Sequence, residues 1–151
     1  MLEQINALIR DNDICVLATA GEAGPHTSLM AYACSPDCGQ IYLVTPRQTA
    51  KYRNLCAQPT VSVMVDTRTQ ATRGEIQALT ISGQAVEMTD PVEVAAVRDV
   101  FVERHPHLKS LMAVPDIAFI RIVIASLQLL RGPRESHYVQ IKAAAILKPQ
   151  A

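Results

Sequence analysis

Residues 41–55 of the chain read IYLVTPRQTAKYRNL, and they contain the change of local pattern that decides the fold. Ile41–Thr45 is apolar and rich in residues that favour strands, so we expect a strand here. Helical spacing of apolar residues then predicts a short helix within residues 46–58. Thr49 suits the N-cap of this helix, and Pro59 stands just past its end. The stretch therefore predicts a strand that leads directly into a helix.

This strand-to-helix junction is also the best candidate for a binding site. The free amides at a helix N-terminus carry partial positive charge and attract anions. Thr45, Thr49 and Lys51 lie beside them, and together they predict a site for a phosphate group. Spacing alone favours a simpler reading, in which Thr49 only caps the helix and the Lys51 side chain is solvated.

The flanking residues predict a mainly β chain. Upstream, residues 2–12 have the pattern of an amphipathic helix, and residues 14–20 and 26–33 those of strands. With the strand at residues 41–45, and with Gly- and Pro-bearing turns between them, they predict an antiparallel meander.

Downstream, strands are expected over residues 61–65, 75–88 and 118–130, and Gly83 marks a bulge or bend in the second. Asp90-Pro91 predicts the start of a helix. The apolar residues expected to form its buried face are Val94, Val97, Val100 and Phe101. After residue 131, residues 143–147 fit a strand or a helix. About six or more antiparallel strands with helices at the ends predict a small barrel.

Length and composition limit the functional classes. A chain of 151 residues, 49% hydrophobic and 19% charged, predicts one folded domain over residues 1–151. The formal net charge is zero and aromatic residues make up 4%, which argues against nucleic acid or an anionic membrane as partner. We find no signal peptide or spanning segment, and four cysteines are too few for a disulfide framework, so a cytoplasmic protein is expected.

The neutral total conceals charged blocks. Residues 1–44 carry one basic and five acidic side chains, whereas residues 45–74 carry five basic and one acidic. The basic block contains the predicted phosphate site, and its size suits one phosphate group.

Cysteine and histidine residues offer weaker signals. Cys34 and Cys38 have a C-x3-C spacing, but no second pair is placed to complete a zinc site, so no metal is expected. Cys15 and Cys56 read as small buried hydrophobic residues.

Among the histidines, His105 and His107 flank a proline and read as an exposed pair in a loop. His26 opens a predicted strand, where it is either solvated or a proton donor.

Three groups of residues resemble the pyridoxamine 5′-phosphate oxidase-like family, whose fold is the FMN-binding split barrel. The first is Val16–Thr19 followed by Gly24–Ser28, which is similar to the family's opening hairpin. The second is the series Tyr42, Thr45, Thr49, Lys51, Asn54, Leu55, Pro59 and Val61–Val63. The third is Ile81–Ala85 before Asp90, and together they cover about residues 2–101.

The resemblance implies a split β-barrel with FMN between two protomers. Thr49 and Lys51 would contact the phosphate, and Val44 and Thr45 would contact both the flavin and the phosphate. Residues 27–30 would lie under the flavin ring and contact it largely through backbone groups. The implied cofactor-binding residues are Thr27, Ser28, Leu29, Met30, Val44, Thr45, Thr49, Lys51 and Gln77. The last stands for a glutamine of the oxidase whose register also allows Ala78.

The chain departs from the oxidase at several positions. Thr27 and Ala50 stand where the oxidase has arginines, and Arg47 or Arg53 are candidates to replace the missing charge. The C-terminal Arg-x-His motif of the oxidase is absent, since residues 134–137 have a different spacing. Oxidation of pyridoxamine phosphate itself is therefore not expected.

We thus expect an FMN-binding homodimer that acts as a flavin-dependent oxidoreductase on a small molecule, with no catalytic residue assigned. A homodimer would also bury apolar surface that a small barrel cannot cover alone. Arg121 or Arg131 could reach the partner's cofactor, although both read more simply as ordinary strand charges. The alternatives are a non-catalytic carrier of flavin, haem or deazaflavin, and a barrel that has lost its cofactor.

Overall fold

The computed structural model of the chain describes residues 1–141. Its α-helices are α1 (Leu2–Asp11), α2 (Ala50–Ala57), α3 (Pro91–Arg104) and α4 (Lys109–Met112). Two 3-10 turns cover Arg73–Glu75 and Pro106–Leu108. The strands are β1 (Ile14–Gly21), β2 (Gly24–Ala31), β3 (Ala33–Cys34), β4 (Gln40–Pro46), β5 (Thr60–Asp66), β6 (Gln77–Glu87), β7 (Ile117–Arg131) and β8 (Glu135–Gln140).

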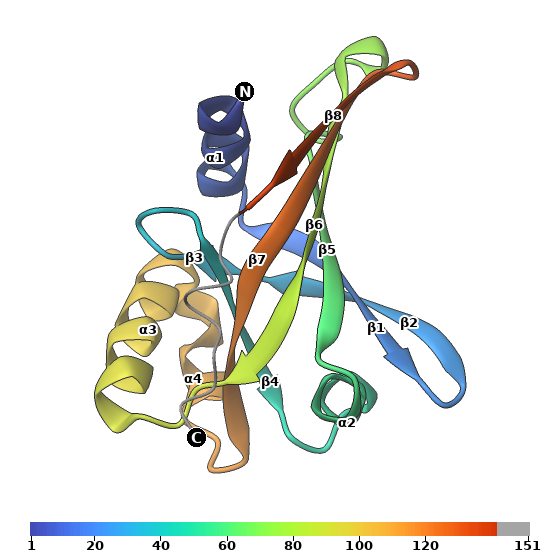
Figure 1. Cartoon of the computed structure of the whole chain (residues 1–151). Helices are drawn as coiled ribbons and strands as arrows, with labels where there is room; N and C mark the ends of the chain where they lie inside the picture. The colour runs from blue at the N-terminus through green and yellow to red at the C-terminus, as the bar shows by residue number, and fades with distance from the viewer. Residues whose placement is uncertain (142–151) are drawn as a thin grey trace.

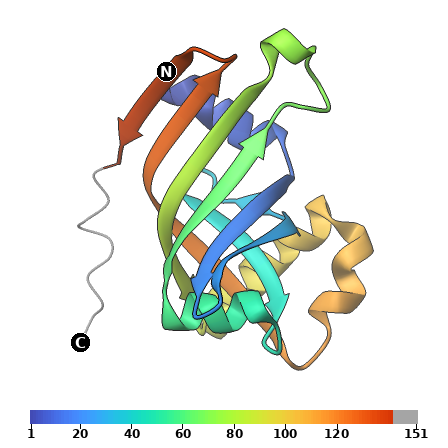
Figure 2. The same cartoon turned by 90° about the vertical axis from the view of Figure 1, so that its right-hand side faces the viewer.

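The strands form one antiparallel sheet that curls into a split barrel, as the sequence predicted. Their order is β2-β1-β5-β6-β7-β4-β3, and β8 pairs with the second half of β7. Figures 1 and 2 show the curled sheet, with α2 across one end of the barrel and α3 against its outside. The open edges belong to β2 and to the strands β3 and β8.

The predicted meander is correct for its first hairpin, but its second is reduced to the two-residue pairing of β3 with β4, with Ala33 opposite Tyr42. β1 pairs with β2 along its whole length, but β4 pairs with β7, with Thr45 opposite Ala118. The reason is that β4 has two apolar faces, because Leu43 and Val44 are both buried. A strand beside β7 is covered on both faces, whereas the edge beside β2 would leave one face in water.

The core has two layers that share β4 and β7. Inside the barrel, Ile5 and Ile9 of α1 and Leu55 of α2 pack with the inward residues of the strands. A second cluster lies between the outer face of the barrel and α3, and includes Val44 and Phe119.

Gly83 lies at an irregularity in the sheet, as expected. The register between β6 and β7 shifts between Ser82 and Gly83. A Cβ atom on Gly83 would lie 2.3 Å from the carbonyl oxygen of Val123 and 2.9 Å from Cγ2 of Ile122. The close approach of the two strands therefore requires glycine here.

Several expectations for single elements were wrong. Val100 is 44% exposed, because α3 buries only the stripe that contains Val97 and Phe101. Cys56 is exposed on the outer side of α2, although Cys15 is buried as expected. Strand β8 was not predicted, because its polar and apolar residues leave no continuous apolar run. The segment 143–147 lies outside the described residues.

His105 is buried rather than exposed. It is 2% exposed, and its Nε2 donates to the carbonyl oxygen of Tyr32 at 2.8 Å. The Tyr32 hydroxyl in turn donates to the carbonyl oxygen of Ile9 at 2.6 Å. These bonds connect α3, β2–β3 and α1, so His105 stabilises the fold while His107 remains exposed.

Within residues 1–141, every helix is too short or too polar to cross a lipid bilayer.

Candidate functional site: an anion cradle between β4 and α2

Two threonine hydroxyls fix the loop between β4 and α2. Thr49 is the N-cap, as predicted, and its Oγ1 accepts from the amide of Tyr52 at 3.2 Å. The same hydroxyl donates to the carbonyl oxygen of Pro46 at 3.0 Å. Thr45 Oγ1 lies 3.2 Å from Thr49 Oγ1. The two threonines predicted to bind phosphate thus first hold the backbone of their own loop.

Lys51 and the first amides of α2 remain available to an anion. Lys51 forms no ion pair with any residue of the described range 1–141. Within the same range the amides of Ala50 and Lys51 have no hydrogen-bond acceptor. We call Thr49, Lys51 and these amides the anion cradle. Thr45 is 2% exposed, so its hydroxyl supports the cradle from inside the barrel.

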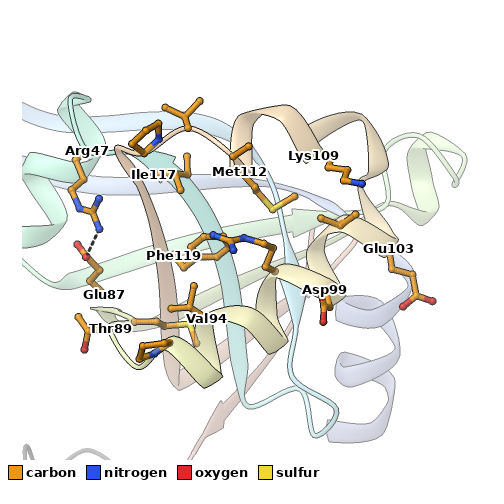
Figure 3. Close-up of a pocket in the computed structure, with 17 residues that line it drawn as sticks. Arg47, Glu87, Thr89, Val94, Asp99, Glu103, Lys109, Met112, Ile117 and Phe119 are labelled. Atoms are coloured by element: carbon orange, nitrogen blue, oxygen red, sulfur yellow. Dashed lines mark hydrogen bonds and ion pairs between the residues drawn. The ribbon is translucent and has the colours of Figure 1, made fainter.

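Arg47 does not replace the arginine that the oxidase has at the position of Ala50, because the Arg47 side chain already forms an ion pair with Glu87. Arg47 Nη2 lies 2.9 Å from Glu87 Oε2 at the end of β6 (Figure 3). The Tyr52 hydroxyl donates to the other carboxylate oxygen of Glu87 at 2.5 Å. Glu87 therefore joins Arg47, two residues before the cradle, to Tyr52 of α2. Arg53 is exposed and has no ion pair within residues 1–141.

These contacts shift the pKa values of Glu87 and Tyr52. Burial raises the pKa of Glu87, but hydrogen bonds from Arg47 and Tyr52 outweigh burial and hold it below its ordinary value. The hydrogen bond to Glu87 is the main reason why the pKa of Tyr52 rises to about 12.

Replacing Glu87 by glutamine tests this contact. We expect E87Q to lower the free energy of unfolding by about 1–2 kcal/mol at pH 7, because a partly exposed charged pair is lost. The lowered pKa of Glu87 means that its contribution is complete above about pH 4.5. It is lost as the pH falls through the folded-state pKa. Denaturant unfolding at pH 7 and at successively lower pH should show the difference between E87Q and wild type shrinking. E103Q, which removes an exposed carboxylate, is the control, and a difference independent of pH would contradict the assignment.

Strand β2 lies near α2 at the open edge of the sheet. Asn54 Nδ2 donates to Thr19 Oγ1 of β1 at 3.1 Å, which attaches α2 to the β1–β2 hairpin, and α2 also contacts β2. Along β2, Leu29 is 76% exposed, whereas Met30 is buried. Because β2 is an edge strand, backbone groups on its outer side face no other strand formed by residues 1–141.

Gln77 does not join the cradle within one chain. It stands at the start of β6 opposite Arg131, whereas Glu87, at the other end of β6, lies beside the cradle. An 11-residue strand is roughly 33 Å long, so this distance separates the two ends. The structure brings together Thr45, Thr49 and Lys51, with Thr27–Met30 on the nearby edge strand β2, which contacts both α2 and β4. Val44 faces the second core cluster.

Sequence reasoning missed the role of Glu87. The sequence indicates this role only by a single carboxylate at the end of an otherwise apolar stretch, Ala85-Val86-Glu87-Met88. Its two partners, Arg47 and Tyr52, are distant in sequence.

The curled antiparallel sheet, with a helix across one end and its N-terminus open to an anion, defines the split-barrel class of proteins. The chain belongs to the pyridoxamine 5′-phosphate oxidase family, whose sequence profile matches residues 1–131. No curated protein sequence matches the chain closely enough to be counted as a relative.

Solved structures share the fold at low sequence identity. A haem-binding protein from Mycobacterium smegmatis has 18% identity and a TM-score of 0.79, and the match covers 93% of this chain and 59% of that one. An FAD-binding protein from Mesorhizobium loti has 21% identity and a TM-score of 0.74, with 89% and 95% covered. General Stress Protein 26 from Bacillus anthracis has 18% identity and a TM-score of 0.72, with 93% and 98% covered. The chain thus spans somewhat over half of the mycobacterial protein.

Proposed function

We propose that the protein binds FMN, with the phosphate in the anion cradle and the flavin ring along β2. The observation that carries the proposal is a lysine without an ion pair in residues 1–141, beside two helix amides without acceptors in that range. A dianionic phosphate satisfies these donors and interacts favourably with the helix N-terminus. Family membership and the similarity to an FAD-binding protein support a flavin.

The activity we propose is flavin-dependent oxidation or reduction of a small molecule. The flavin supplies the redox chemistry, and the protein binds and orients it. Lys51 balances the phosphate charge, Thr49 holds the helix start in place, and the outer edge of β2 offers backbone groups to the ring. Their task is positioning.

We further propose that the working unit is a homodimer with the cofactor at the interface. Leu29 is 76% exposed and Ile14 is 48% exposed on the same hairpin, and both suit burial against a second copy. Gln77 lies too far from the cradle to reach the same flavin within one chain, so it would act from the partner.

A haem carrier is the second candidate, supported by the similarity to a haem-binding protein. His26 supports it as well, because this exposed imidazole stands on β2 near the proposed ring site. In a flavin site the same side chain is a candidate proton donor.

The visible spectrum of the purified protein separates these functions. We expect flavin absorption bands, or their appearance with one FMN per protomer after FMN is added. A Soret band would indicate the haem carrier, and a colourless protein that takes up no FMN would overturn the flavin proposal. Bleaching of bound flavin by NADH or NADPH, with turnover when an acceptor is added, would identify an enzyme; flavin that stays oxidised with both donors would indicate a carrier.

A further inference from the structure

A second cleft lies on the opposite face of β4 from the anion cradle. It has a volume of about 930 Å³ and is bounded by α3, by α4 and the chain that follows it, and by the ends of β6 and β7 (Figure 3). Val44 and Phe119 are paired residues of β4 and β7 and belong to the cluster outside the barrel. Thr45, the next residue of β4, supports the cradle from inside the barrel. The cleft is therefore separate from the cradle, and the Arg47–Glu87 pair lies between the two.

The walls of the cleft are mainly apolar. Met88, Val94, Met112, Ile117 and Phe119 line it, and its volume lies in the range typical of small-molecule sites. Met88 and Met112 are at most 5% exposed and form the floor, whereas Val94 and Val102 of α3 are partly exposed and form the accessible wall. The walls thus suit a flat apolar group.

One cation is held in the middle of this apolar surface. The Arg98 Cζ atom lies 5.2 Å from the centre of the Phe119 ring, so the ring holds the guanidinium by a cation–π contact. Arg98 forms no ion pair with any residue in the described part of the chain. Its planar donors match the two oxygens of a carboxylate.

The other charges of the cleft lie at its ends. Figure 3 shows the Arg47–Glu87 pair at one end and Asp99, Glu103 and Lys109 at the other, with Phe119 between them. Arg47 and Glu87 neutralise each other. An anionic group above Phe119 therefore meets Arg98 as its nearest lining charge and stays apart from the acidic end.

We propose that this cleft binds a small aromatic carboxylate, with its ring against Val94 and Val102 of α3 and its carboxylate on Arg98. This site is independent of the flavin, and it stands whether or not the cradle holds FMN.

A matched pair of ligands tests the proposal: 2-naphthoate and the neutral 2-naphthamide, each titrated with the protein of residues 1–151 and followed by ligand fluorescence. We expect 2-naphthoate to bind about 10-fold more tightly, since only the acid forms the charge-assisted bond to Arg98. R98Q should remove this difference by weakening 2-naphthoate alone, and R134Q, an exposed arginine on the β7–β8 turn, should change neither ligand. V94W, which fills the cleft, should weaken both.

Saturating FMN provides the final control and should leave 2-naphthoate bound. Displacement by FMN would place the ligand in the flavin site and overturn the proposal. Equal affinity for the two ligands, no binding of either, or unchanged binding to V94W would each overturn it too. R98Q replaces an exposed residue, so its folding is secure, and circular dichroism checks V94W.

Discussion

Replacing Lys51 by alanine should weaken FMN binding roughly 10- to 100-fold, which corresponds to losing one charge-assisted hydrogen bond of about 1.5–3 kcal/mol. The effect is expected to be large because two phosphate-neutralising arginines of the oxidase are absent here, and because Glu87 holds the nearby Arg47. Lys51 would then be the main side-chain charge facing the phosphate. Equilibrium titration, followed by quenching of flavin fluorescence, measures the change.

Two controls locate the effect at the phosphate. Riboflavin lacks the phosphate, so its affinity should be the same in K51A and wild type. R53A removes an exposed charge from the same helix and should change FMN affinity less than twofold. If K51A weakened riboflavin as much as FMN, or if R53A matched K51A, the phosphate would not lie in the cradle.

Replacing Gly83 by alanine should lower the free energy of unfolding by about 3 kcal/mol. The added methyl group would lie 2.3 Å from the carbonyl oxygen of Val123, and that oxygen belongs to a strand paired on both sides. The strands must separate locally, which strains the backbone hydrogen bonds of β6 and β7. Thermal unfolding should show a fall in Tm of roughly 6–12 °C.

G74A is the matched control for this substitution. Gly74 lies in a surface turn, and a Cβ atom there meets no atom within 4 Å. Its Tm should stay within about 2 °C of wild type, because the methyl group enters open space. If G83A were as stable as G74A, β6 and β7 would not approach each other closely enough at Gly83 to exclude a methyl group.

The sequence predicted those elements that local pattern controls. Three such features are the N-cap at Thr49, the start of α3 at Asp90 and the bulge at Gly83. Each is indicated by the residue type at that position and its immediate neighbours in sequence. Pairing of β4 with β7 could not be read in this way, because it depends on which distant strand covers the second apolar face of β4.

The same limit applies to the candidate site. The cradle residues lie within one short loop, so their spacing was enough to propose them. The capture of Arg47 by Glu87 and the burial of His105 against Tyr32 depend on tertiary contacts. A basic residue near a predicted phosphate site is not free to bind until its other neighbours are known. The placement of Gln77 at the far end of β6 likewise depends on the length and pairing of that strand, which the sequence around Gln77 does not reveal.

The position of β7 in the chain has a consequence for folding. This strand pairs with β6 along its length, with β4 by its first half and with β8 by its second, yet it begins only at Ile117. During synthesis β4 therefore cannot pair with β7 until most of the chain has emerged from the ribosome. Pairing over such long sequence separations makes folding slow and leaves strand edges exposed in the meantime. The barrel should close late and in one step, and nascent chains that stop before β7 should depend on chaperones.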